Sequence, residues 1–459
     1  MKDKKIIVCL KYYKGELNPF DASALECALL SGSKDITVVA MAPKSVQENL
    51  KGLTRLGVKA VLVTDMAYAG SDTLITSLVL EKAIKNIPHD VIFCGRQSID
   101  GDTAQVPLML AKRLDYQVLQ KVVSFDESGV VLRSGERVNP ENKTVLTFER
   151  IKNLRFPSIF SKAQEVKVLD NTSLNIPLDK CGLNASPTAV VNVYESTVEK
   201  RACKFIKAEE FNNVLQNCLN DNEENKQTIE KCDTEKLENV ICFGDIVELV
   251  KGVAKHVIEF SYNGKSAEQI AKEIKITNVK TLLFSDTDDL KKLASELAVI
   301  LDGGLCADCI GLRVENGKFI MTRPAHSASI TADIICKSEY TLATLRTVKK
   351  GVSDVVVSIG NGASSFLDKA KAFADKLGAE VCASRTVVDN GVMSYSAQVG
   401  LTGKRVSPKV YLAFGVSGAV QHTCAISGAK FIIAVNKDKN ARIFDYADYG
   451  VIADIKDLI

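Results

Sequence analysis

Short runs of β-branched and apolar residues recur along this chain, and amphipathic segments separate them. In the first hundred residues the apolar runs cover 5–10, 36–41, 58–63 and 91–94. This alternation is the pattern of parallel strands joined by crossover helices. After the first run, Asn18 can cap a helix, Pro19 suits its first position and Asp21 suits its positive first turn. The sequence therefore predicts an α/β fold with a helix over 19–30.

The pattern of the first half returns later in the chain. Residues 91–95 precede a predicted helix over 105–114, as residues 282–286 precede one over 290–301. A hairpin-like stretch with glycine follows each copy, at 127–131 and at 315–319. We therefore expect two related nucleotide-binding-like domains.

A third unit begins near Asp354 with a strand, a glycine turn and a helix that ends at Leu377. Further strands are predicted over 379–383, 410–416 and 430–435. This order is typical of a doubly wound domain, which binds its ligand at the carboxyl ends of its strands. The chain should thus hold three α/β domains.

Composition places the boundaries between these domains. The sequence changes character after Cys203, and residues 220–226 are polar and charged. We predict a first domain over 1–207, a linker region over 208–238, a second, shortened domain over 239–347 and a third over 348–459.

Charge and cysteine content exclude several classes of protein. Lys and Arg total 59 against 56 acids, and the net charge of +3 does not predict a nucleic-acid partner or a membrane surface. The apolar run at 6–10 is too short for a signal peptide or a membrane span. Thirteen scattered cysteines fit reduced thiols and a cytoplasmic location. Cys306 and Cys309 have C-x-x-C spacing but no second ligand pair, so we expect no metal site.

Small and polar residues follow the predicted strands of the third unit. They form three loops, at 384–385, 398–403 and 417–422. Ser417 and Gly418 should open a helix, whose free N–H groups would face an anion. Any one of these motifs can be a simple turn or cap, but three loops at consecutive strand ends favour a nucleotide.

These loops resemble the FAD-binding domain of the α subunit of electron-transfer flavoproteins. The shared motifs are Ala-Ser-Arg at 383–385, Gln-Val-Gly-x-Thr-Gly at 398–403, Ser-Gly-Ala-Val-Gln-His at 417–422, Val-Asn-Lys-Asp at 435–438 and Ala-Asp-Tyr-Gly at 447–450. The first half resembles the β subunit, with Asn-Pro-Phe-Asp at 18–21, Ala-Gly-Ser-Asp-Thr-Leu at 69–74 and Cys-Gly-Arg-Gln-Ser-Ile-Asp-Gly-Asp-Thr-Ala-Gln-Val at 94–106. The chain thus resembles a β-type half and an α-type half in one polypeptide.

The resemblance implies that FAD binds to the C-terminal domain. Arg385 would lie over the isoalloxazine, Thr402 near its reactive nitrogen and His422 near its pyrimidine carbonyl. A fixed cation there would favour the anionic, reduced forms of the ring. One departure is Asn361, where the family carries an arginine, which predicts looser FAD binding. The other residues implied to line FAD are Ser384, Gln398, Val399, Gly400, Ser417, Gly418, Ala419, Val420, Gln421, Asn436, Asp454 and Ile455.

The β-type half resembles a second nucleotide site, which holds AMP or a second FAD in family members. The form Gly-Asp-Thr-Ala-Gln-Val at 101–106 resembles that of members that bifurcate electrons. Gly101 opens space and removes a carboxylate, while Thr103 and Gln105 would face phosphate. We favour a second FAD and keep AMP as the alternative. The residues implied are Cys9, Asn18, Asp21, Ala40, Cys94, Asp100, Gly101, Asp102, Thr103, Ala104, Gln105 and Val106.

The implied activity is electron transfer by a flavin on a domain that swivels about a hinge near 346–352. The family's commonest partner is an acyl-CoA dehydrogenase or a similar flavin dehydrogenase, and direct reduction by NADH stays open. An NAD-dependent dehydrogenase is the alternative, but no strand is followed by Gly-x-Gly-x-x-Gly. A non-catalytic nucleotide sensor would leave Arg385 and His422 without a role.

Overall fold

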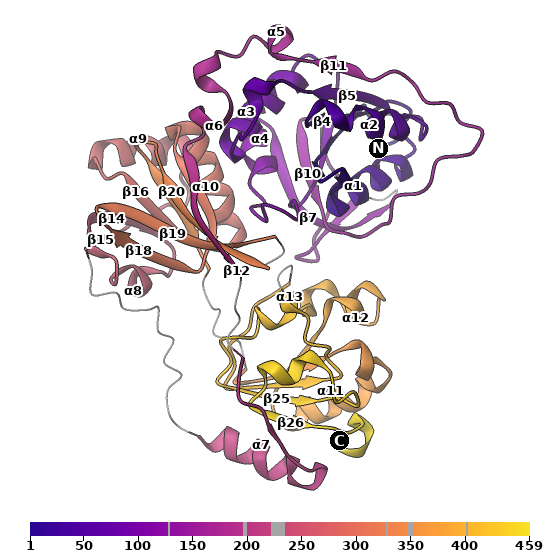
Figure 1. The fold of residues 1–459 in the computed structure, drawn as a ribbon, viewed down its shortest axis with the longest axis vertical. Coiled ribbons are helices and arrows are strands. Elements are labelled where there is room, and N and C mark those ends of the chain that lie inside the picture. The colour runs from indigo at the N-terminus through magenta and orange to yellow at the C-terminus, as the bar shows by residue number, and fades with distance from the viewer. Residues whose placement is uncertain (127–128, 196–199, 222–234, 327–328, 347–352, 401–402) are drawn as a thin grey trace. The chain divides into compact units, whose positions relative to one another are not determined.

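The computed structural model describes residues 1–126, 129–195, 200–221, 235–326, 329–346, 353–400 and 403–459. The chain divides into two compact units (Figure 1). The first unit comprises 1–194, 231–326 and 331–346, and the second comprises 195–230, 327–330 and 347–459.

The first half of the first unit is built on a nine-stranded sheet of order β11-β5-β4-β1-β6-β10-β7-β8-β9. The strands from β11 to β7 are parallel, and β8 and β9 are antiparallel. Its central strands are buried, as their apolar runs predict. The strands are β1 (Ile6–Leu10), β4 (Ile36–Met41), β5 (Lys59–Val63), β6 (Val91–Gly95), β7 (Gln117–Asp126), β8 (Gly129–Leu132), β9 (Arg137–Val138), β10 (Thr144–Phe148) and β11 (Lys167–Leu169). A separate short hairpin is formed by β2 (Tyr12–Tyr13) and β3 (Glu16–Leu17).

Helices connect these strands. They are α1 (Pro19–Leu30), α2 (Gln47–Thr54), α3 (Thr73–Ile84) and α4 (Val106–Leu114), with the short α5 (Asn171–Leu174) and α6 (Gly182–Ala185) further along. The bounds predicted for α1 are confirmed. The prediction that the Asn18 side chain caps this helix is wrong, because its Nδ2 donates to the carbonyl oxygen of Gln97 at 2.9 Å instead.

The second half of the first unit contains two further sheets. One is parallel, of order β15-β14-β16-β21-β17, and the other has the order β12-β20-β19-β18. The expected hairpin at 315–319 is confirmed, with Asn316 and Gly317 at positive φ in its turn. The turn of the matching hairpin, at 127–128, lies outside the described residues. The elements are β12 (Thr188–Glu195), β14 (Leu237–Phe243), α8 (Val247–Val250), β15 (Ala254–Glu259), α9 (Ala267–Thr277), β16 (Thr281–Ser285), α10 (Asp288–Leu301), β17 (Gly304–Cys309), β18 (Gly311–Glu315), β19 (Lys318–Ala325), β20 (Ile330–Cys336) and β21 (Thr341–Leu345).

The two halves of this unit share a core. Leu74 on α3 and Met109 on α4 belong to the same buried cluster as the apolar residues of α9 and α10. At the rim, Lys112 forms an ion pair with Glu268, and Lys121 forms one with Asp288. The first and second halves therefore pack as one unit.

The second unit is a six-stranded parallel sheet of order β13-β26-β25-β24-β22-β23. The chain starts at β22, adds β23 on one side and then β24, β25 and β26 on the other, which is the doubly wound order predicted. The elements are β13 (Lys204–Phe205), α7 (Phe211–Asn220), β22 (Val355–Ile359), α11 (Leu367–Lys376), β23 (Glu380–Ala383), α12 (Arg385–Asp389), β24 (Val410–Phe414), α13 (Val420–Thr423), β25 (Phe431–Val435) and β26 (Tyr449–Val451).

An earlier segment of the chain completes this sheet. Strand β13 pairs with β26, and helix α7 buries Phe211, Leu215 and Cys218 in the core that contains Phe414. Part of the range predicted as a linker is thus an amphipathic helix, and residues 222–234 lie outside the described residues.

Candidate functional site

The strand ends of the second unit meet at one edge of its sheet. The N–H of Gly360, after β22, donates to the carbonyl oxygen of Phe414 in β24 at 2.7 Å. The N–H of Ser384, after β23, donates to the carbonyl oxygen of Ile359 in β22 at 2.9 Å. Strands β23 and β24 lie on opposite sides of β22, so the topological switch point falls where ligands of such sheets bind.

Glycines let the loops at this edge approach one another closely. A Cβ at Gly360 would lie 2.1 Å from the carbonyl oxygen of Gly415. Gly418 has φ +85°, and its Cβ would lie 2.1 Å from the nitrogen of Ile443. Side chains are excluded from both positions, because backbone of a neighbouring loop packs against each of these buried glycines.

The loop at 398–400 lies against the loop that carries α13. Val399 is bridged to the end of β23 through a bond from its N–H to the Ala383 carbonyl oxygen at 2.9 Å. A Cβ on Gly400, which has φ +147°, would lie 3.2 Å from the carbonyl oxygen of Gln421. Two of the motifs predicted to hold one ligand are therefore neighbours.

His422 is a buried imidazole at this edge, only 6% exposed. Its Nε2 lies 2.8 Å from the hydroxyl oxygen of Tyr411 in β24. Its Nδ1 is buried and has no hydrogen-bond partner in the part of the chain that the structure describes. Burial lowers the pKa of His422 to about 4, so the ring is neutral at pH 7.

Arg385 is the first residue of α12 and lies at the same edge. Its Nε is 3.2 Å from a carboxylate oxygen of Asp389, one turn further along. The two side chains are 34% and 38% exposed, so solvent screens the pair. The guanidinium is held at the rim of the site rather than in a buried pocket.

The other residues predicted to line this site occupy the remaining strand ends. Asn436 follows β25 and donates from Nδ2 to the Val416 carbonyl oxygen at 2.9 Å. Asp454 follows β26 and pairs with Lys437 at 3.0 Å, and Ile455 beside it is buried. Asn361 is exposed, and Thr402 lies outside the described residues.

The expectation that Ser417 and Gly418 open a helix is wrong. Helix α13 starts at Val420 and is a single turn, with Ala419 at its N-cap and no side-chain cap. Ser417, Ala419 and Gln421 are exposed on the preceding loop and this turn, while Gly418 is buried. Anion recognition by a longer helix is therefore not available here.

A second edge of strand ends lies in the first half of the chain. Cys9 in β1 and Cys94 in β6 are direct register partners, and Ala40 in β4 is the partner of Leu10. These are again the strands on either side of a switch point. The structure thus brings together the ends of three strands on which second-site residues were predicted.

Asp21 closes the gap between two of these strands. Its carboxylate oxygens accept from the N–H groups of Lys11 at 2.8 Å and Gly95 at 2.9 Å. It lies in the first turn of α1 as predicted. Burial raises the pKa of Asp21 to about 7, although the bonds from Asn18, Lys11 and Gly95 oppose this rise.

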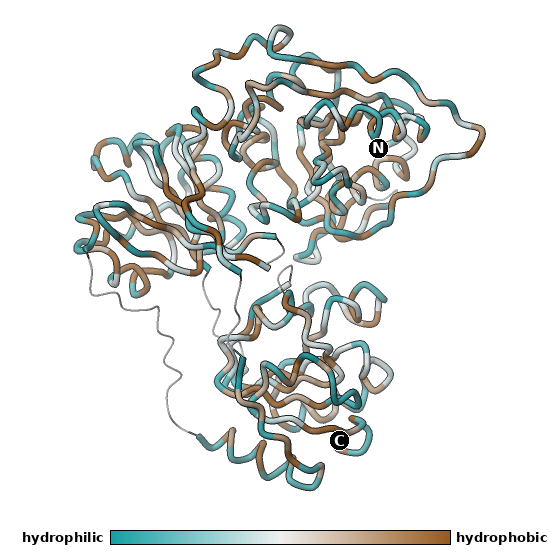
Figure 2. Tube along the Cα trace, in the orientation of Figure 1, coloured by the Kyte–Doolittle hydropathy of each residue, from teal (hydrophilic) through white to brown (hydrophobic). Residues whose placement is uncertain are grey.

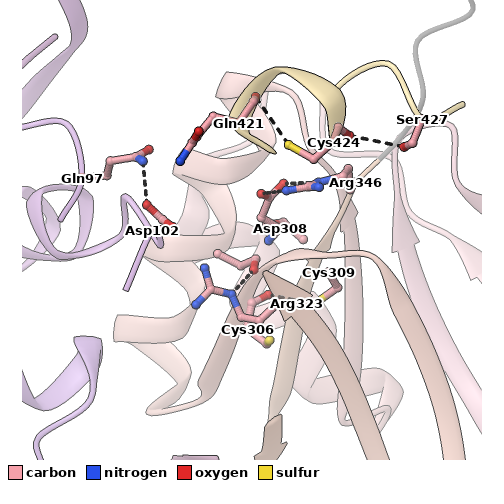
Figure 3. Close-up of polar contacts among 12 residues, drawn as sticks. Gln97, Asp102, Cys306, Asp308, Cys309, Arg323, Arg346, Gln421, Cys424 and Ser427 are labelled. Carbon is pink, nitrogen blue, oxygen red and sulfur yellow. Dashed lines mark hydrogen bonds and ion pairs between the residues drawn. The ribbon is translucent and has the colours of Figure 1, made fainter. Parts of the chain in front are cut away.

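The loop between β6 and α4 forms one side of this second edge. Lys11 pairs with Asp100 at 2.8 Å, and Gln97 donates to Asp102 at 2.9 Å (Figure 3). Asp102 and Ala104 have positive φ, which turns the chain sharply before the helix. A Cβ at Gly101 would meet nothing closer than 3.4 Å, so this position is open.

Gln105 is buried at the start of α4, beside Val106. Its Oε1 accepts from Thr73 at 2.8 Å, and its Nε2 donates to the Leu305 carbonyl oxygen at 3.2 Å. Its side-chain amide therefore ties the two halves of the unit together, while Thr103 stays partly exposed.

Two residues of the second half also reach this loop, and sequence reasoning missed both. Arg323 on β19, labelled in Figure 3, donates from Nη1 to the carbonyl oxygen of Gly101 and from Nε to the carbonyl oxygen of Ala307. Both distances are 2.7 Å. Its Nη2 is buried without a partner among the described residues. The N–H of His326 donates to the Asp100 carbonyl oxygen at 3.0 Å. The one available signal was an arginine inside the apolar run at 319–325.

The chain between β10 and β11 carries exposed apolar side chains. Phe156, Ile159 and Phe160 are 94%, 82% and 87% exposed. This segment runs outside the sheet, and its outermost part is coloured hydrophobic (Figure 2). Three exposed large apolar side chains within five consecutive positions differ from the singly scattered ones of an ordinary surface.

Two kinds of feature do not occur in the described residues. None of their helices has the length and apolar character needed to cross a bilayer. They also contain no group of three or more His, Cys, Asp or Glu side chains arranged to hold a metal ion.

Two family models match the ranges of the chain that contain these two sheet edges. The model of the electron transfer flavoprotein domain matches residues 6–149 and 259–352, and that of the electron transfer flavoprotein FAD-binding domain matches residues 351–427. The second match covers the loops around Arg385 and His422.

Related proteins match each half separately. The electron transfer flavoprotein subunit alpha of Syntrophomonas wolfei is 31% identical over 296 residues, which cover 51% of this chain and 93% of that subunit. The subunit beta of Thermoanaerobacterium thermosaccharolyticum is 36% identical over 203 residues, 40% of this chain and 77% of that subunit. The acryloyl-CoA reductase electron transfer subunit beta of Anaerotignum propionicum is 30% identical over 250 residues, 38% of this chain and 68% of that subunit. The chain therefore belongs to the electron transfer flavoprotein family, with β-like and α-like halves in one polypeptide, and is an electron transfer flavoprotein that binds FAD in its C-terminal region.

Proposed function

We propose that the flavin ring lies at the carboxyl edge of the second unit's sheet, between Arg385 and His422. The observation that carries this is the buried Nδ1 of His422, which has no partner among the described residues. A buried polar atom without a bond is costly, and a flavin carbonyl would supply the missing bond. Bound FAD supplies the one- and two-electron chemistry, and the protein holds and biases it.

The residues around the ring would set its preference for electrons. Arg385 places a positive charge at the rim, while the neutral His422 supplies only a dipole. Reduction makes the pyrimidine side of a flavin more negative, so both groups favour the reduced forms. The same proposal includes Thr402, which would lie near the reactive nitrogen of the ring.

We propose that the first half binds a second nucleotide, FAD in preference to AMP, at the ends of β1, β4 and β6. Support comes from the open position at Gly101 and from the unpaired Nη2 of Arg323 beside it. A buried guanidinium next to a turn rich in backbone N–H groups suits a phosphate or an electron-rich ring. Lys11 and Asp100 already neutralise each other, which leaves the charge of Arg323 for a ligand.

We propose that the chain exchanges electrons with an acyl-CoA dehydrogenase or a similar flavin dehydrogenase, and that NADH is the donor if the second nucleotide is FAD. The exposed segment with Phe156, Ile159 and Phe160 is the docking surface in this proposal. The predicted hinge at 346–352, apart from Arg346, lies outside the described residues. A cytoplasmic location fits the free cysteines of the described residues.

The decisive experiment is to denature the purified protein and count the FAD and AMP released per chain. Two FAD, followed by bleaching on titration with NADH, would support electron bifurcation. One FAD with AMP would exclude it and keep the single-flavin carrier. A protein without flavin that takes up none would overturn the proposed site altogether.

A further inference from the structure

Tyr411 lies directly behind His422 in the core of the second unit. It belongs to the central strand β24 and is fully buried, at 0% exposed. Its ring meets the imidazole edge-on, with the ring centroids 6.1 Å apart. Ser358 of β22 lies on the same face of the sheet, because Val356, two residues earlier, is the register partner of Tyr411.

The environment of Tyr411 decides which group donates in its bond with His422. Burial raises the pKa of Tyr411 well above its ordinary value, so the phenol keeps its proton. Ser358 opposes this rise, although its buried Oγ has no hydrogen-bond partner among the described residues. The phenol proton needs an acceptor in this dry core, and Nε2 of His422 lies 2.8 Å away. Tyr411 therefore donates and Nε2 accepts.

This direction fixes the other nitrogen of His422. A neutral imidazole has one N–H and one bare nitrogen, so a bare Nε2 leaves the proton on Nδ1. The backbone of Val399 opposes the fall in the pKa of His422, so this loop lies against the ring, while Nδ1 has no hydrogen-bond partner among the described residues. Val399 belongs to the loop predicted to line the flavin, so Nδ1–H is on the ligand's side of the ring.

We propose that Tyr411 is a positioning residue that fixes the tautomer of His422, so that a neutral imidazole offers Nδ1–H to the flavin as a hydrogen-bond donor. The inference rests on the proposed flavin position. A donor bond strengthens as negative charge grows on its acceptor, so this arrangement favours reduced over oxidised flavin without adding a buried charge.

The tautomer can be measured in the full chain without flavin. The protein has four histidines, so nitrogen-15 labelling of histidine gives a small set of ring signals in NMR, and His422→Gln identifies the one sought. At pH 7 we expect Nδ1 of His422 to carry the proton and Nε2 to be bare. A proton on Nε2 of His422, or a charged ring, would overturn the proposal.

Tyr411→Phe removes the donor and keeps the ring. We expect the His422 proton to move to Nε2, and the potential of bound FAD to fall by the equivalent of about three- to tenfold weaker binding of reduced relative to oxidised flavin. Tyr449→Phe, in β26 of the same sheet, is the matched control and should leave both readings unchanged. An unchanged tautomer in Tyr411→Phe would refute the inference. Failure to bind FAD would instead refute the proposed flavin position, because the tautomer is read in the flavin-free chain.

Discussion

Arg323 donates a hydrogen bond from Nη1 to the carbonyl oxygen of Gly101, 222 positions earlier in the chain, at 2.7 Å. A strand of the α-like half thereby holds the loop at 96–105 of the β-like half in place. The proposed second nucleotide site would thus be formed by residues of both halves.

Replacement of Arg323 should weaken this second site selectively. Arg323→Ala removes two backbone bonds and one buried charge, so we expect at least tenfold lower affinity for the second nucleotide, from the loss of roughly 1.5–3 kcal/mol per charged bond. The FAD of the C-terminal region should remain. Counting the nucleotides released per chain measures the occupancy of both sites at once. Lys318→Ala, at an exposed position on the same strand, is the control. Equal loss of both nucleotides would mean that the substitution disturbs the whole fold.

Asp21 should make stability depend on pH. Its pKa is raised by burial from 3.8 to about 7, so the folded protein holds a proton that the unfolded chain releases between these values. The stabilisation is complete below pH 4 and is lost as pH rises through 7, at up to about 1.4 kcal/mol per pH unit.

Asp21→Asn removes this titration. Urea unfolding at pH 5 and pH 7 should show a larger difference for the wild type than for the variant. Asp126→Asn, at an exposed ion pair with Arg137, is the control and should behave as the wild type does. If the variant kept the full pH difference, another group would be responsible.

Arg385 should raise the flavin potential, and Asp389 should limit that effect. A full charge at about 4 Å in an effective dielectric near 20 is worth on the order of 4 kcal/mol, or roughly 170 mV for one electron. The Arg385 side chain is 34% exposed and is paired with Asp389, so we expect only a fraction of this shift in potential. Arg385→Ala should lower the one-electron potential, and Asp389→Asn should raise it. Spectroelectrochemical titration compares the two, and a shift of the same sign in both would show that the pair acts as a unit.

The apolar segment at 156–160 should govern the reaction with a redox partner. Phe156→Ser and Phe160→Ser remove exposed side chains that support no core, so FAD content and thermal stability should stay the same. The rate of electron exchange with an acyl-CoA dehydrogenase should fall about tenfold or more, as for the loss of an interface hot spot. Leu183→Ser, an exposed apolar residue elsewhere, is the control in stopped-flow measurements. Equal rates in all variants would place the docking surface elsewhere.

Local patterns predicted elements well and side-chain partners poorly. The apolar runs predicted β1, β4, β5 and β6 within one residue of the observed bounds, because a buried strand requires apolar residues at consecutive positions. Asn18 is a residue type that commonly caps helices. Its side-chain amide instead donates to the carbonyl oxygen of Gln97, which the sheet brings near. Arg323 could not be assigned to the loop at Gly101, since the contact depends on how the two halves pack and no periodicity encodes it.

At the candidate site, too, the positions of residues along the fold were predicted better than their side-chain partners. Motif order placed Arg385, His422 and the glycine loops at strand ends, where the structure brings them to one edge. The pattern marks Tyr411 only as a strand position, and nothing in it indicates that the hydroxyl of Tyr411 lies 2.8 Å from Nε2 of His422. It also suggested a longer helix after β24 than the single turn that forms.

The packing of α4 against α9 and α10 has a consequence for assembly. The relatives that match each half are subunits, whereas Lys112 and Glu268 here belong to one polypeptide. The meeting of the two halves is a first-order, intramolecular event whose equilibrium is independent of protein concentration. Dilution cannot separate the partners, and synthesis always supplies them in equal number.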